Sequence, residues 1–131
     1  NPAGAWALRS AISACFPDRR LIFIFGAMRD KAIGEIAEIL FPLAEWVIVT
    51  AADNPRSATA EEIRDAAGRT GAEIGLSRSV EDAIDVAGKL ACSDRSVRAT
   101  QPVQASVVVI TGSIYVVGEA MRVLGVGADG K

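Results

Sequence analysis

Apolar and polar positions alternate along this chain in a way that predicts four strands and five helices. Runs of Val, Ile and Phe predict strands at 21–25, 46–50 and 107–110, since β-branched and aromatic residues favour strands, and 72–75 has room for a short fourth one. A segment with apolar residues every three or four positions, the spacing of one helix face, follows each strand. Such alternation predicts a mostly parallel sheet with helices on both faces. We therefore expect one Rossmann-like, three-layer α/β domain over residues 1–131.

Several residues are suited to begin helices. Pro2 stands at the first position of the first helix, where proline is favoured. Asp30, Thr59 and Ser79 can accept hydrogen bonds from free amides at helix starts, and Glu62 completes a capping box with Thr59. The positions predicted to face the core are Leu8, Ala11, Ile12 and Cys15 in the first helix, Ile33, Ile36, Ala37 and Leu40 in the second, Ile63, Ala66 and Ala67 in the third, and Val80, Ala83, Ile84 and Ala87 in the fourth.

The stretch 107–119 is the most informative part of the sequence. Four β-formers predict a buried parallel strand, Thr111-Gly112-Ser113 follows, and an apolar pattern of helical spacing comes next. A small, hydroxyl-rich turn there would place amide groups and hydroxyls at the carboxyl edge of the sheet, where open α/β folds bind ligands. Because a helix N-terminus favours negative charge, the turn is a candidate site for a carboxylate or phosphate. The alternative is that its hydroxyls only cap the helix.

Two other strand ends carry polar groups. After the first strand, Arg29 or Lys31 is available for a phosphate or carboxylate; alternatively, Asp30 caps the next helix and both cations are solvated. After the second strand, Arg56 in the segment 53–57 has the geometry to hold a carboxylate with two parallel hydrogen bonds, or the segment is simply a proline-containing turn. None of these turns is a complete active site by itself.

Composition narrows the classes of function. The net charge of −2 gives no reason to expect nucleic acid or an anionic membrane as a partner, and no apolar run approaches the roughly 20 residues of a membrane span. There is no histidine to complete a zinc site or a Ser-His-Asp triad, so we expect no metal site in the chain. Cys15 is expected in the core of a protein of the reducing cytoplasm.

Three further expectations concern the ends of the chain and its loops. The start at Asn1 has no basic and apolar leader, so no signal peptide is expected, and the chain resembles an excised domain. The polar stretch 92–105 is predicted to be a loop and 125–131 a frayed tail. No G-x-x-x-x-G-K-[ST] segment is present, so nucleotide phosphates would be bound mostly outside this chain.

Four segments, in order along the chain, resemble motifs of one enzyme family. Asn1–Ala5 resembles the end of a D-x-A-H-N-P motif, Phe25–Lys31 resembles F-G-x-x-x-D-K, and Pro55–Ala58 resembles P-R-[SA]. Ile110–Glu119 resembles the closing T-G-S-L-Y-L-V-G-E, the most specific of the four. These motifs are typical of the C-terminal domain of folylpolyglutamate and dihydrofolate synthases, within the Mur ligase superfamily.

This resemblance implies an ATP-dependent, ADP-forming amide ligase that activates folate or dihydropteroate as an acyl phosphate and joins it to L-glutamate. ATP with Mg²⁺ would be bound mainly by an N-terminal domain that this chain lacks. The Asp and His of the first motif would also precede Asn1, so the isolated domain is expected to be inactive. The enzyme is expected in the cytoplasm.

The resemblance also implies roles for particular residues. Ser113 matches the serine of the T-G-S turn, which contacts glutamate in that family. The residues expected to bind substrate are Ser113, Thr111, Gly112, Asn1 and Arg56, and those expected on the ATP side of the cleft are Asp30 and Lys31.

Two alternatives remain open at this point. The segment Asp53–Arg56 also resembles the D-N-P-R loop of the Mur ligase that adds the third residue to the peptidoglycan peptide, where the loop binds a diamino acid. That relative does not end in T-G-S-x-Y, so folate is the first hypothesis and a peptidoglycan peptide ligase the second. The third is a ligand-binding module without catalysis.

Overall fold

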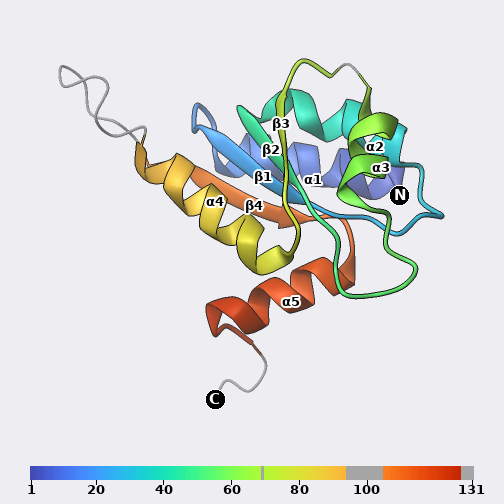
Figure 1. Cartoon of the computed structure of the whole chain (residues 1–131). Helices are drawn as coiled ribbons and strands as arrows, with labels where there is room; N and C mark the ends of the chain where they lie inside the picture. The colour runs from blue at the N-terminus through green and yellow to red at the C-terminus, as the bar shows by residue number, and fades with distance from the viewer. Residues whose placement is uncertain (69, 94–104, 128–131) are drawn as a thin grey trace.

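Helices and strands alternate along the chain in the predicted order (Figure 1). The computed structural model describes residues 1–68, 70–93 and 105–127. The elements in order are α1 (Pro2–Cys15), β1 (Leu21–Phe25), α2 (Ile33–Leu40), the 3-10 turn η1 (Phe41–Leu43), β2 (Trp46–Val49), α3 (Ala60–Ala67), β3 (Glu73–Leu76), α4 (Val80–Ser93), β4 (Val107–Thr111) and α5 (Ile114–Leu124).

The four strands are parallel and lie in the order β3-β2-β1-β4. The first three strands extend the sheet in one direction, whereas β4 returns to the other side of β1. Open α/β sheets form a crevice where the strand order reverses, at the carboxyl ends of the two flanking strands. Here those ends are Phe25 and Thr111, which are partners in the register of β1 and β4.

Helices cover both faces of the sheet (Figure 1). α1, α2 and α3 share a core with Phe23 and Phe25 of β1, whereas α4 packs against Ile22 and Ile24 on the opposite face. α5 joins α4 on that second face through Val116. Successive side chains of a strand point to opposite faces, so β1 supplies both cores. The predicted three-layer α/β fold is confirmed.

β4 differs from its prediction in one respect. The sequence predicts a buried strand, but within the described residues β4 pairs with β1 alone and forms an edge of the sheet. Val108 is 37% exposed and the other residues of the strand are partly buried. A run of apolar residues predicts the strand but does not show whether it has one neighbour or two.

Three residues predicted to face the core are exposed: Ala11, Cys15 and Ala66. The buried face of α1 is centred on Ala5 and Ile12. At 3.6 residues per turn, Cys15 lies about 60° and Ala11 about 100° around the helix from Ile12, beyond the edge of that face. Ala66 is displaced in the same way, because consecutive residues are about 100° apart and the next residue of α3 is the buried one.

The predicted caps of α3 and α4 are confirmed. Thr59 Oγ1 accepts from the Glu62 amide at 3.0 Å, and Glu62 Oε1 accepts from the Thr59 amide at 2.8 Å, which is the predicted capping box. Ser79 Oγ accepts from the Asp82 amide at 3.1 Å.

Two other predictions fall largely on residues that are not described. The loop predicted at 92–105 coincides mostly with 94–104, and the end of the predicted tail coincides with 128–131. α4 continues to Ser93, slightly past the predicted start of that loop. In the part of the chain that the structure describes, no helix has the length and apolar character needed to cross a membrane.

Candidate functional site

Three turns meet at the carboxyl edge of the sheet, one after each of β1, β2 and β4. The amide of Gly26 donates to the Thr111 carbonyl at 3.3 Å, and the amide of Ala58 donates to the Ala27 carbonyl at 2.9 Å. Between these turns lies a pocket of about 360 Å³. Six of the seven candidate site residues line it: Asn1, Asp30, Lys31, Arg56, Gly112 and Ser113.

Two glycines allow the turns after β1 and β4 to come into contact. Gly112 has φ of +120°, and a Cβ there would lie 1.8 Å from the Gly26 carbonyl oxygen. A Cβ on Gly26 would in turn lie 2.6 Å from Val116 Cγ2 and 2.8 Å from the Thr50 carbonyl oxygen. Only glycine fits such a close approach of two backbones. These contacts fix the position of Ser113 at the mouth of the crevice.

Ser113 is the N-cap of α5. Its backbone is extended and its Oγ accepts from the Val116 amide at 3.1 Å. A helix leaves its first amides without helical partners, and the first two residues of α5, Ile114 and Tyr115, line the pocket. The Ser113 hydroxyl can still donate its hydrogen while its oxygen accepts, so the cap does not prevent it from binding a ligand.

Asp30 does not cap α2, so of the two alternatives for this turn the one in which it caps the helix is wrong. The N-cap residue is Ala32, which makes no side-chain cap. An additional turn precedes the helix, since the Lys31 amide donates to the Met28 carbonyl at 3.2 Å and Ile33 donates back to Lys31 at 2.9 Å. This turn moves Asp30 away from the helix start and into the lining of the pocket.

Asp30 and Arg56 form an ion pair in the lining of the pocket. Their nearest charged atoms, Asp30 Oδ2 and Arg56 Nη2, are 3.9 Å apart, and the side chains are 64% and 74% exposed. An exposed ion pair at this distance contributes little to stability, so exchanging Asp30 for another carboxylate would cost the guanidinium little. With Lys31 in the same lining, the pocket offers two cations and one carboxylate beside a helix N-terminus.

Arg29, the other cation considered for a phosphate, is engaged within the protein. Its Nη1 donates to the Pro55 carbonyl at 3.0 Å and its Nε donates to Glu62 Oε1 at 3.2 Å. The amide of Thr59 donates to the Glu62 carboxylate and Arg29 lies beside it, and both lower the pKa of Glu62. Arg29 therefore links the β1–α2 turn to the loop that carries Arg56.

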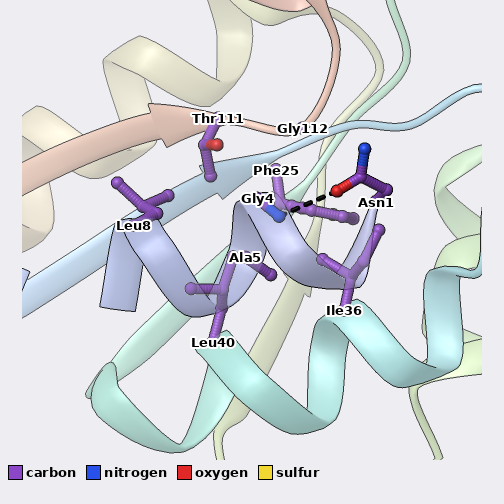
Figure 2. A pocket seen from close by; sticks show the side chains of 9 residues that line it. All are labelled: Asn1, Gly4, Ala5, Leu8, Phe25, Ile36, Leu40, Thr111 and Gly112. Carbon is purple, nitrogen blue, oxygen red and sulfur yellow. Dashed lines mark hydrogen bonds between the residues drawn. The ribbon is translucent and has the colours of Figure 1, made fainter. Parts of the chain in front are cut away.

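Thr111 lines a second, neighbouring pocket of about 290 Å³ (Figure 2). Asn1 and Gly112 line both pockets. Asn1 also caps α1, because its Oδ1 accepts from the Gly4 amide at 2.8 Å, the bond drawn in Figure 2. The rest of this second lining is mostly apolar, from α1, α2 and the end of β1: Gly4, Ala5, Leu8, Phe25, Ile36 and Leu40.

Sequence reasoning did not select three residues that line the first pocket, namely Met28, Ile114 and Tyr115. Ile114 is 79% exposed, which is unusual for a large apolar side chain. Its position directly after the T-G-S turn is the signal that could have identified it. Within the described residues, no three His, Cys, Asp or Glu side chains gather as metal ligands would.

Comparisons with known proteins identify the family and the fold. Residues 1–114 match the family model described as Mur ligase, glutamate ligase domain. The chain is 35% identical over 130 residues to the dihydrofolate synthase/folylpolyglutamate synthase of Mycobacterium tuberculosis, and this match covers 95% of the chain and 26% of the relative.

Solved structures show the same fold. The folylpolyglutamate synthase of M. tuberculosis complexed with ADP and AMPPCP matches with a TM-score of 0.82 and 34% identity, over 97% of this chain and 28% of that one. FolC from E. coli in complex with DHPP and ADP matches with a TM-score of 0.76 and 23% identity, over 95% of this chain and 27% of that one. The chain thus spans about a quarter of the length of these relatives.

Proposed function

We propose that this chain, which belongs to the Mur ligase family of glutamate ligase domains, is the acceptor-binding domain of a folate ligase. The complete enzyme would join L-glutamate to the carboxylate of a folate or dihydropteroate, with release of ADP and phosphate. We place this enzyme in the cytoplasm.

The observation that carries this proposal is the pocket at the carboxyl ends of β1 and β4, where the strand order reverses. It combines a helix N-terminus, the Ser113 hydroxyl and the Arg56 guanidinium, which are groups suited to carboxylates. An acidic amino acid has two carboxylates, and the pocket offers a group for each: the start of α5 with Ser113 for one, and Arg56 for the other. Its amino group would then attack the activated carbonyl carbon, and the bond from that carbon to the phosphate oxygen would break as phosphate leaves.

In this scheme the chain contributes binding and orientation of the acceptor. Holding two reactants in place makes their reaction effectively unimolecular and lowers the barrier. The chain has no P-loop sequence, and its described residues gather no set of metal ligands. We therefore assign ATP and Mg²⁺ mainly to an N-terminal domain, with Asp30 and Lys31 at the edge of the pocket that faces the nucleotide.

The test is ADP release by the complete protein that contains this chain. The donors are dihydropteroate, tetrahydrofolate and a UDP-muramoyl dipeptide, and the acceptors are L-glutamate and meso-diaminopimelate. We expect ADP release with L-glutamate and at least one of the first two donors. Activity with none of the combinations would favour the non-catalytic module instead.

A peptidoglycan peptide ligase is the second candidate. The observation in its favour is that Arg56, the last residue of the Asp53–Arg56 segment, lines the pocket. ADP release that requires meso-diaminopimelate and the UDP-muramoyl donor would establish this alternative and exclude the folate ligase.

A further inference from the structure

A carboxylate on α5 binds the loop that carries Arg56, residues 51–58. Glu119 Oε2 accepts from the backbone amide of Asp53 at 2.7 Å. This is short for a hydrogen bond from an amide and typical of a charged acceptor. Glu119 lies on the helix that Ser113 caps. One helix thus holds both the Ser113 side of the pocket and one end of the Arg56 loop.

The Arg56 loop has other contacts as well: Ala52 belongs to a buried cluster with Val116 and Ala120 of α5, and the Arg56 carbonyl accepts from the Arg29 amide at 3.0 Å. Asn54 Oδ1 accepts from the Arg56 amide at 2.9 Å, and the Asn54 amide donates to the Ala52 carbonyl at 2.8 Å. These bonds shape the loop internally. Arg29 holds its far end to the β1–α2 turn. Within the described part of the chain, the bond from Glu119 is the hydrogen bond that joins the loop to α5.

We propose that Glu119 is a positioning residue for the acceptor amino acid. It holds the Asp53 end of the Arg56 loop against α5 and thereby keeps the guanidinium across the pocket from Ser113. This inference rests on the proposed function, since it takes the pocket as the acceptor site. Without the carboxylate, the Asp53 amide loses its partner and the loop can shift, which weakens binding of the acceptor and leaves the nucleotide site unchanged.

The experiment compares three variants of the complete protein. Glu119→Ala removes the acceptor of the hydrogen bond, Glu119→Gln keeps an acceptor oxygen, and Glu38→Ala removes an exposed carboxylate from α2 as the control. We expect the KM for the acceptor amino acid to rise roughly tenfold in Glu119→Ala, while the KM for ATP changes by less than about twofold. Glu119→Gln should recover most of the loss, and Glu38→Ala should match the wild type.

A second readout reports on the loop without using activity. Hydrogen exchange at the Asp53 amide, measured well below the unfolding transition of every variant, should be faster in Glu119→Ala and close to the wild type in Glu119→Gln. Faster exchange with an unchanged KM for the acceptor would overturn the positioning role, as would an equal rise in both KM values.

The two proposals fail in different ways. If the wild type releases ADP only with meso-diaminopimelate, the folate assignment is wrong, but Glu119→Ala must still raise the KM for that acceptor. If the wild type uses no acceptor at all, both proposals are wrong. If the wild type uses L-glutamate and Glu119→Gln is as impaired as Glu119→Ala, only the role of Glu119 is refuted.

Discussion

The hydroxyl of Ser113 accepts from the Val116 amide and at the same time lines the pocket. The sequence allowed a cap or a binding residue at this position, and the geometry is compatible with both. A substitution to alanine would change both properties together. Separating them requires a side chain that keeps the cap but repels a carboxylate.

Aspartate at position 113 meets that requirement. Ser113→Asp keeps an N-cap oxygen, so the free energy of unfolding should stay within about 0.5 kcal/mol of the wild type, whereas Ser113→Ala should lose about 1 kcal/mol. Both changes should raise the KM for L-glutamate in the complete protein, and Ser113→Asp should raise it more because its charge repels the substrate. Urea unfolding and steady-state kinetics measure the two effects.

Ser79 is the matched control for this pair. It caps α4 with the same 3.1 Å bond length but does not line the pocket. Ser79→Ala should therefore cost about 1 kcal/mol of stability and leave the KM for L-glutamate unchanged. If Ser113→Asp bound glutamate as well as the wild type, Ser113 would be only a cap.

Glycine at 112 is required by sterics, and the effect of replacing it should be large. Gly112→Ala would place a Cβ 1.8 Å from the Gly26 oxygen, so the backbone of both turns must move. We expect a loss of more than about 3 kcal/mol in the free energy of unfolding. Gly125→Ala, at a left-handed position with open space around it, should lose about 1 kcal/mol. Equal losses in the two variants would contradict the close contact of the turns.

At the scale of the elements, local sequence signals predicted most of the structure. The capping box of α3 and the serine caps of α4 and α5 depend on residues within one turn of each other, so they could be predicted from spacing. The failures depend on tertiary context. Asp30 has the chemistry of a cap but lies opposite Arg56 instead, and the exposure of Cys15 depends on which side of α1 contacts α2.

The capping box should also make stability depend on pH. The pKa of Glu62 is lowered by the bond from the Thr59 amide and by Arg29. A carboxyl whose pKa is lower in the folded protein stabilises it above the unfolded pKa, and this contribution is lost as the pH falls through the folded value. Glu62→Gln should therefore unfold at lower urea concentration than the wild type at pH 7, and the difference should shrink below the ordinary pKa of 4.5. A difference that is constant from pH 7 to pH 3 would contradict this.

At the scale of the whole molecule, the strand order explains what the sequence could not. Periodicity predicted parallel strands and helices on both faces, but not that β4 returns to the edge beside β1. That return brings Ser113 to the turn that follows β1. The loop that carries Arg56 contacts the same turn, because the amide of Arg29 in that turn donates to the Arg56 carbonyl at 3.0 Å. Contacts between residues so distant along the chain have no local signature.

The open side of the pocket leads to a last prediction, that the chain alone binds the acceptor but catalyses no ligation. Asp30 and Arg56 are both mostly exposed, so water surrounds the site on this domain, whereas an acyl phosphate must be protected from water until the amine attacks.

Urea unfolding would first show that the isolated chain is folded. It should then release no ADP with ATP, folate and L-glutamate. If ATP is bound by an N-terminal domain, as proposed, adding that domain as a separate protein should restore ADP release in proportion to its concentration, because the two parts must meet without a linker. The restored rate of ADP release should be lower with the Ser113→Ala chain and unchanged with the Ser79→Ala chain. Glutamate-dependent ADP release by the chain alone would refute this prediction.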